Sequence, residues 1–141
     1  MKINKNNVRL IRIDRIPNSK NNICICTCPL CGEEIKMWSS CFYRGSNSCK
    51  CKNEAVGYER IYSAWINMKT RCYNKKSIQF SDYGGRGILI SEEWRFNFKE
   101  FKDWSIKNGY AEKLTIDRID NSRGYSSENC RWVDMYQQAR N

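Results

Sequence analysis

Cysteines are the residues of this 141-residue chain whose type and spacing most clearly indicate chemistry. The segment Cys-Pro-Leu-Cys-Gly over residues 28–32 has the two-residue spacing and the following glycine of a zinc knuckle. In such a turn two thiolates face one ion while backbone N–H groups approach the sulfur atoms. Clustered cysteines in a reducing compartment hold a metal more often than they form disulfides. Seven of the nine cysteines lie in one region, at Cys24, Cys26, Cys28, Cys31, Cys41, Cys49 and Cys51.

The spacing within this cluster predicts one zinc ion. Four thiolates complete the tetrahedral coordination that structural zinc prefers, and residues 32–48 are enough for a strand and its return between two pairs of ligands. The predicted ligands are Cys28, Cys31, Cys49 and Cys51. Two alternatives stay open, because a second ion could bind, or one member of the set could be replaced by Cys24, Cys26 or Cys41.

Free thiols that fill the core of a small domain are the other interpretation of this cluster. Seven cysteines within 28 residues would be an unusual core, because Val or Ile packs as well without oxidising. We therefore favour a metal site. Four sulfur ligands leave no open coordination position, so we expect a structural zinc that lets a unit too small for its own core fold.

A second group of polar residues lies near the C-terminus, in the segment LTIDRIDNSRGYSSENCRWV over residues 114–133. Asp117 and Asp120 fit carboxylates that cap the DNSRG turn and pair with nearby arginines, Arg118 or Arg123. A Gly-Gly-Arg-Gly loop lies earlier in the chain, but it lacks the glycine spacing of a dinucleotide or phosphate-binding loop, so we expect a turn there. Candidates for contact with phosphates or base edges are Arg86, Arg118, Arg123 and Arg131.

The charge of the chain suggests what these groups contact. Lys and Arg number 25 against 15 Asp and Glu, which gives a net charge of +10 and favours a polyanionic partner, nucleic acid above all. With 40% hydrophobic and 13% aromatic residues the chain is expected to fold. It has no long apolar run and no signal-peptide pattern, so we expect a cytoplasmic protein with no membrane partner.

The elements expected to position these groups form an α+β fold of two domains. Residues 1–55 are predicted to be a zinc-bound, β-rich module, with strands over 8–13, around Ile23 and Ile25, and over 34–38. The strand over 8–13 is expected to be half-buried, because apolar and basic residues alternate along it. The second domain is predicted to cover residues 56–141.

Helices and a C-terminal ββα unit are expected in the second domain. Ile61, Trp65, Met68 and Cys72 recur at helical spacing and predict a helix over 58–73. Residues 88–90 look like a strand, and Phe98, Phe101 and Trp104 predict an apolar face on a helix over 97–107, with Asn97 as its N-cap and Gly109 after its end. Two strands and a short helix are then expected over 114–119, 130–133 and 134–140.

Three segments, residues 58–74, 80–94 and 114–133, resemble a group of small phage proteins known as HNH endonucleases or HNH-like DNA-binding proteins. The cysteine-rich region is similar to the N-terminal part of the same group, which commonly ends in a Ser-Cys-X-Cys element like that over residues 48–51. The resemblance covers nearly the whole chain and is most specific over residues 114–133. It implies double-stranded DNA as the partner and a ββα unit that holds one divalent ion, Mg²⁺ or Mn²⁺, against the scissile phosphate.

The resemblance also assigns roles to individual residues. It implies that Asp117 is the metal-binding carboxylate, that Asn129 orients the general base, and that Gln138 lies near the position of a second metal ligand. Arg118 occupies the position of the general-base histidine, and an arginine with a pKa above 12 cannot take a proton from water. Cleavage would need Asp120 or a metal-bound hydroxide as the base, with Arg118 binding the phosphate.

Several functions are consistent with this pattern. The first is a DNA-binding protein of the phage HNH-like group, either retaining an atypical metal-dependent nickase or endonuclease activity or having lost it. The second is a non-enzymatic interaction protein that inhibits or recruits a host or defence protein. A transcriptional regulator on the same scaffold is the third. The residues at positions 117, 118, 129 and 138 distinguish a nuclease from a binding protein.

Overall fold

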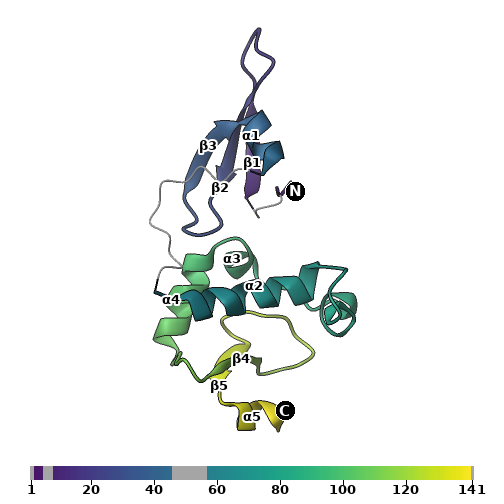
Figure 1. Cartoon of the computed structure of the whole chain (residues 1–141), viewed down its shortest axis with the longest axis vertical. Helices are drawn as coiled ribbons and strands as arrows, with labels where there is room; N and C mark the ends of the chain where they lie inside the picture. Colours follow the sequence, from purple (N-terminus) through teal and green to yellow (C-terminus); the bar gives the residue numbers. More distant parts are fainter. Residues whose placement is uncertain (1, 5–7, 46–56, 141) are drawn as a thin grey trace. The chain divides into compact units, whose positions relative to one another are not determined.

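The computed structural model describes residues 2–4, 8–45 and 57–140 (Figure 1). Helices and small sheets are mixed along the chain, which confirms the α+β class. The chain divides into two compact units. Unit 1 comprises Met1–Glu54 with Phe96–Lys99, and unit 2 comprises Ala55–Arg95 with Glu100–Asn141. Among the described residues no helix has both the length and the apolar character needed to span a bilayer.

Unit 1 contains a three-stranded antiparallel sheet in the order β1-β2-β3. The strands are β1 (Arg9–Asp14), β2 (Ile23–Thr27) and β3 (Glu34–Trp38), close to the predicted positions, and a short helix α1 (Ser39–Arg44) follows that the sequence pattern does not predict. The core of this unit gathers around one face of β2. It is formed by Val8, Cys24, Cys26, Cys28, Ile35, Met37 and Phe42.

The expected burial of β1 is wrong over its second half. Ile11 and Ile13 are about half exposed. The physical reason is twofold: β1 is an edge strand, and a register shift between Leu10 and Arg12 interrupts the two-residue alternation on which the prediction depends.

In unit 2 the longest helix is α2 (Glu59–Tyr73), where the sequence predicts a helix over 58–73. The four apolar residues at helical spacing, from Ile61 to Cys72, are all buried, as predicted. A one-turn helix α3 (Glu92–Arg95) precedes α4 (Phe98–Lys107), which ends before Gly109, a glycine with φ of +84°. The N-cap prediction for Asn97 is wrong, because its side-chain oxygen is buried and has no hydrogen-bond partner among the described residues.

The loop between α2 and α3 contains two 3-10 helices, η1 (Phe80–Asp82) and η2 (Gly84–Arg86). A side chain at Gly84 would collide with the Cys72 carbonyl, so only glycine allows this close approach to the end of α2. The predicted strand over 88–90 is reduced to one bridge between Ile90 and Tyr125. The chain turns into α3 directly afterwards, which leaves no room for a longer ladder.

The C-terminal part of unit 2 is an antiparallel hairpin followed by a helix (Figure 1). Strands β4 (Thr115–Arg118) and β5 (Cys130–Val133) pair so that Thr115 faces Val133 and Asp117 faces Arg131. Helix α5 (Met135–Ala139) begins after Asp134, whose carboxylate accepts a hydrogen bond from the Gln137 N–H at 2.8 Å. The predicted order of strand, turn, strand and helix is therefore present.

A buried cation lies on α2. Lys69 is 8% exposed, its Nζ lies 4.0 Å from the centroid of the Trp65 ring, and it has no hydrogen-bond partner among the described residues. Burial, followed by the nearby charge of Arg95, lowers the pKa of Lys69 to about 8. The folded state therefore binds this proton less tightly than the unfolded chain does.

The change Lys69→Met is expected to raise the free energy of unfolding at pH 7 by about 1–2 kcal/mol, less than the full pKa shift implies because the cation–π contact is lost. Between the pKa of about 8 and the ordinary value of 10.5 only the unfolded wild type keeps the proton, so the contribution of Lys69 to wild-type stability rises with pH in this window. That rise should be absent in the variant. Urea unfolding from pH 7 to 10.5 measures both the stability at pH 7 and its pH dependence. The exposed Lys76→Met is the control. If Lys69→Met and the wild type have equal stabilities and parallel pH profiles, the lowered pKa of Lys69 is contradicted.

Candidate functional site

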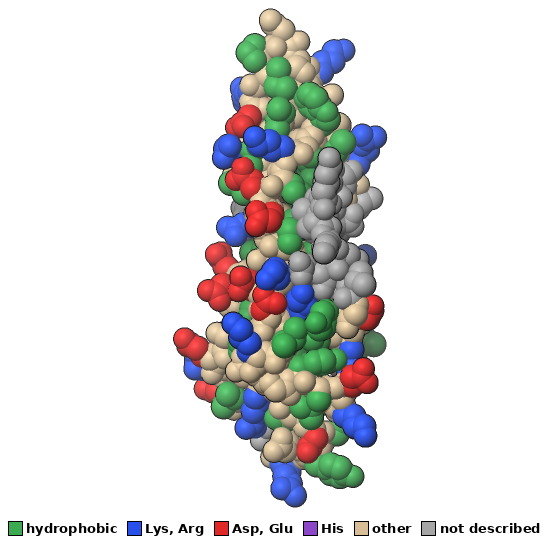
Figure 2. All heavy atoms as spheres, turned by 90° about the vertical axis from the view of Figure 1, so that its left-hand side faces the viewer, with side chains coloured by type: hydrophobic (Ala, Val, Ile, Leu, Met, Phe, Trp, Pro, Cys, Tyr) green, Lys and Arg blue, Asp and Glu red, His purple; other side chains and the backbone are tan. Residues whose placement is uncertain are grey.

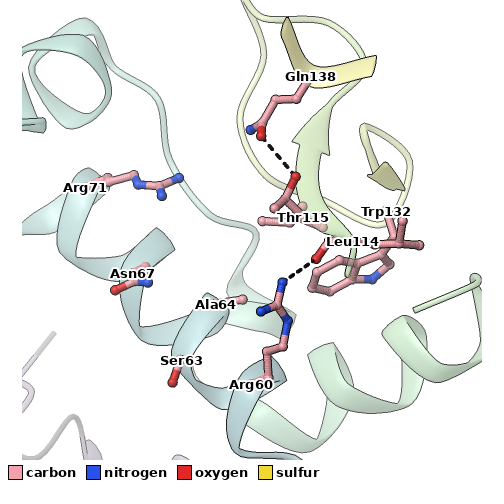
Figure 3. Close-up of a pocket in the computed structure, with 10 residues that line it drawn as sticks. Arg60, Ser63, Ala64, Asn67, Arg71, Leu114, Thr115, Trp132 and Gln138 are labelled. Carbon is pink, nitrogen blue, oxygen red and sulfur yellow. Dashed lines mark hydrogen bonds between the residues drawn. The ribbon is translucent and has the colours of Figure 1, made fainter. Parts of the chain in front are cut away.

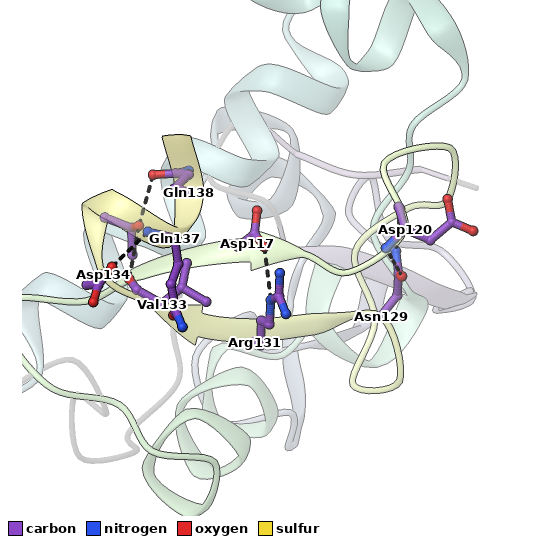
Figure 4. A network of polar contacts seen from close by, with 9 residues as sticks. Asp117, Asp120, Asn129, Arg131, Val133, Asp134, Gln137 and Gln138 are labelled. Atoms are coloured by element: carbon purple, nitrogen blue, oxygen red, sulfur yellow. Dashed lines mark hydrogen bonds and ion pairs between the residues drawn. The ribbon is translucent and has the colours of Figure 1, made fainter. Parts of the chain in front are cut away.

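The central residue of the hairpin is Asp117 on β4 (Figure 4). Its carboxylate accepts a hydrogen bond from Arg131 Nε across the strand pair, at 3.1 Å. The Asp117 side chain is 8% exposed, whereas that of Arg131 is 45% exposed. The carboxylate that the resemblance assigns to a metal ion is thus already held by a cation of the neighbouring strand.

Arg118, which the resemblance places where a general-base histidine would be, is turned into the protein. It is buried, and its Nη1 donates hydrogen bonds to the carbonyl oxygens of Asn121 and Arg123, both at 2.8 Å. Its guanidinium also lies 5.3 and 5.4 Å from the ring centroids of Tyr83 and Tyr125. These contacts close the turn between β4 and β5, and they leave little of the guanidinium charge open to solvent.

The turn is held from its other side by Asn129. The buried Nδ2 donates to the carbonyls of Asp120 and Gly124 at 3.0 and 2.8 Å, and Oδ1 accepts from the Asp120 N–H at 2.9 Å. The Asp120 carboxylate accepts from the hydroxyl and the N–H of Ser122, and these hydrogen bonds lower its pKa below the ordinary value. Asp120 therefore caps the turn, as the sequence suggests, and its lowered pKa makes it a weaker base.

Gln138 on α5 lies at the opposite end of the hairpin. Its Oε1 accepts a hydrogen bond from Thr115 Oγ1 at 3.0 Å. Figure 4 shows the result: Asp120 and Asn129 lie at the turn, Asp117 in the middle of β4, and Gln138 beyond the other end. The four positions that the resemblance assigns to catalysis, together with the alternative base Asp120, do not surround one point.

The hairpin offers few ligands for a divalent ion. Asp117 offers one carboxylate, which an ion would have to share with or take from Arg131. Among the described residues no group of three or more Cys, Asp or Glu side chains could hold a metal. The residues of the hairpin thus do not fit a ready-made Mg²⁺ or Mn²⁺ site, which needs oxygen ligands close to octahedral geometry.

Proton acceptors are also scarce around the hairpin. The chain contains no histidine. Burial raises the pKa of Cys130 and of Tyr125 to about 12, and that of Cys72 to about 11. These groups keep their protons near neutral pH, whereas a general base must be unprotonated so that it can take a proton from water.

A groove lies beside the hairpin, between α2 on one side and β4 with α5 on the other (Figure 3). Its volume is about 260 Å³, and no acidic residue is among those that line it. The polar lining residues are Arg60, Ser63, Asn67, Arg71, Thr115 and Gln138. The sequence pattern does contain a signal for this feature, because the four polar residues of α2 recur at helical spacing, but the opposite wall is visible only in the structure.

The remaining predicted DNA-contacting residues are spread over two loops. Arg86 is exposed in η2, and its Nη1 donates to the Asp82 carbonyl at 3.3 Å. Arg123 is exposed in the turn that Arg118 closes. On the face shown in Figure 2, basic and acidic side chains are interspersed, so the described part of that face does not present one continuous basic patch.

The cysteine-rich segment forms a tight turn in unit 1. The N–H of Leu30 approaches Cys28 Sγ at 3.4 Å, the N–H of Gly32 donates to the Cys28 carbonyl at 2.9 Å, and Gly32 has φ of +78°. These are the features expected of a knuckle that presents two sulfur atoms to one ion. The partner ligands predicted for this site, Cys49 and Cys51, lie outside the described residues.

The alternative zinc ligands belong to the same core as the cysteines of the knuckle. Cys24 and Cys26 lie on β2, Cys28 follows the end of the strand, and all three are fully buried in the core of unit 1. Cys41 is partly buried against that core. The seven cysteines in the described part of the chain form no disulfide with one another. Burial in this core therefore does not by itself distinguish Cys24 and Cys26 from Cys28 as ligands.

Comparisons with family models, with curated proteins and with solved structures give no match. The function must therefore be argued from the site itself, since a fold alone does not determine function. Three features of the molecule bear on its function: the basic charge, the hairpin whose turn Arg118 closes, and the groove beside that hairpin.

Proposed function

We propose that this protein binds double-stranded DNA with a ββα unit of the phage HNH-like type that has lost the ability to hydrolyse it. The observation that carries this proposal is the position of Arg118, whose guanidinium is bound inside the turn where a nuclease needs an exposed general base. The pairing of Asp117 with Arg131 supports the same conclusion, because it occupies the carboxylate that a metal ion would need.

The affinity for DNA is attributed to charge. A net charge of +10 favours a polyanion, and each phosphate that Lys or Arg neutralises releases counterions. Base-specific contacts would come from exposed arginines in the loops, Arg86 and Arg123. Arg118 is too buried for this role, and Arg131 is shared with Asp117.

The N-terminal unit is proposed to be a structural zinc module of a protein that works in the reducing cytosol. The turn at Cys28 and Cys31 supports one half of the site, and Cys49 and Cys51 are proposed to supply the other half. When bound, the ion would crosslink segments of a unit with a small core. The absence of disulfides among the described cysteines is consistent with that compartment.

A protein partner is the second candidate. Met135 and Tyr136 are neighbours on α5 and are 72% and 83% exposed. Methionine and tyrosine are both frequent in protein interfaces. This pair would suit a host or defence protein as the partner if DNA binding is not observed.

The proposal predicts that the protein retards duplex DNA in a salt-dependent manner and leaves it uncut when Mg²⁺ or Mn²⁺ is present. Gel-shift and plasmid-relaxation assays with the full chain measure the two properties on the same substrate. Binding without cleavage supports the proposal. Cleavage that needs both the divalent ion and Asp117 would overturn the claim that hydrolysis has been lost.

A further inference from the structure

We infer that the groove between α2 and β4 is the binding site for the DNA backbone, with Arg60 and Arg71 each contacting a phosphate. The inference rests on the proposed function and extends it, since it names the surface that does the binding. It also differs from the sequence-based expectation, which places the contacts on the loops and the hairpin.

The charges of the two arginines are available for a ligand. Arg60 donates to the Leu114 carbonyl at 3.1 Å and to Tyr110, and Arg71 donates to Gln79 Oε1 at 3.0 Å and to Tyr125. All four partners are neutral, so they orient the guanidinium groups without cancelling their charge. A guanidinium has five N–H donors, which leaves some free for phosphate oxygens.

The walls of the groove suit a phosphate chain. Figure 3 shows Arg60 and Arg71 extending from α2 toward the side where Thr115 and Gln138 lie. Ser63 and Asn67 lie between the two arginines on the same helix, and no carboxylate lines the groove to repel an anion. Neutral donors beside cations are the usual contacts of a DNA backbone.

The spacing along α2 separates the two contacts. Eleven residues at 1.5 Å per residue place Arg60 and Arg71 about 16 Å apart along the helix axis. The two guanidinium groups are therefore expected to contact different phosphates. Each lost contact should lower the slope of log K against log salt by about 0.9, so losing both should lower it by about 1.8.

The test measures fluorescence anisotropy of a labelled short DNA duplex against salt for the full chain. The double variant Arg60→Gln with Arg71→Gln should lose about 1.8 from the slope and bind roughly 60-fold more weakly at about 0.1 M salt. The control, Lys76→Gln with Lys107→Gln, removes the same charge from exposed positions of unit 2 and should keep most of the wild-type slope.

A second pair of variants covers the case in which the double variant does not fold. Asn67→Glu keeps both arginines but places a carboxylate in the groove one helical turn from Arg71, where it should neutralise charge and weaken binding, whereas Asn67→Gln should not. Equal losses in the arginine and lysine double variants, or equal binding by both Asn67 variants, would overturn the inference. If the wild-type protein binds the duplex without any salt dependence, the proposed function itself, and not only this site, would be contradicted.

Discussion

The change Arg118→Ala is expected to lower the free energy of unfolding of unit 2 by about 3–5 kcal/mol. Two carbonyl oxygens, those of Asn121 and Arg123, would lose a charged donor, and the rings of Tyr83 and Tyr125 would lose the cation that lies over them. Four of the five tryptophans lie in unit 2, so urea unfolding followed by tryptophan fluorescence measures its stability.

Arg123→Ala is the matched control for this change, because it removes the same charge from the exposed side of the same turn. It should alter the stability by no more than about 0.5 kcal/mol. If both alanine variants unfold at the same urea concentration as the wild type, Arg118 has no structural role. The proposed structural role of Arg118 in place of a general base would then fail, because the arginine would be free to act on a ligand.

Removing zinc is expected to unfold unit 1 while unit 2 keeps its structure. Structural zinc sites in small peptides contribute about 10–16 kcal/mol of apparent binding free energy, which a core of this size cannot replace. The measurement is far-UV circular dichroism, together with the fluorescence of Trp38 on β3, before and after a strong chelator. Cys28→Ser and Cys31→Ser should have the effect of the chelator.

Metal content separates the ligands from the core cysteines. The purified protein should carry one zinc, and Cys49→Ser or Cys51→Ser should lose it. Cys24→Ser and Cys26→Ser should destabilise the core of unit 1, where both side chains pack, but keep the metal, because neither belongs to the predicted ligand set. A chelator that leaves the circular dichroism and the thermal melt unchanged would rule out the zinc module.

Much of the fold follows from local pattern. The apolar spacing on α2 and the turn-forming residues between β4 and β5 predict elements that the structure contains. The expectations that are wrong depend on neighbours rather than on local sequence. The strand over 88–90 has only Tyr125 to pair with, and Asn97 is buried where its side chain cannot cap α4.

The site was harder to predict than the fold. The sequence shows that Arg118 cannot be a base, but its two carbonyl partners and the ring of Tyr83, 35 positions earlier, come together only in the folded chain. The groove illustrates the same limit. Arg60 and Arg71 can be placed on the polar face of α2 from spacing alone, whereas Thr115 and Gln138 become their neighbours through the packing of unit 2.

The most direct test of the account incubates the 141-residue chain with supercoiled plasmid at low and high salt, with and without Mg²⁺ or Mn²⁺, beside the Asp117→Ala variant. The account predicts a shift that weakens as salt rises, by roughly 10³-fold in affinity between 50 and 200 mM for about six phosphate contacts. It also predicts that the plasmid stays supercoiled in every lane. Divalent-dependent nicking that disappears in Asp117→Ala would contradict the loss of hydrolysis, and the absence of any shift would contradict DNA binding.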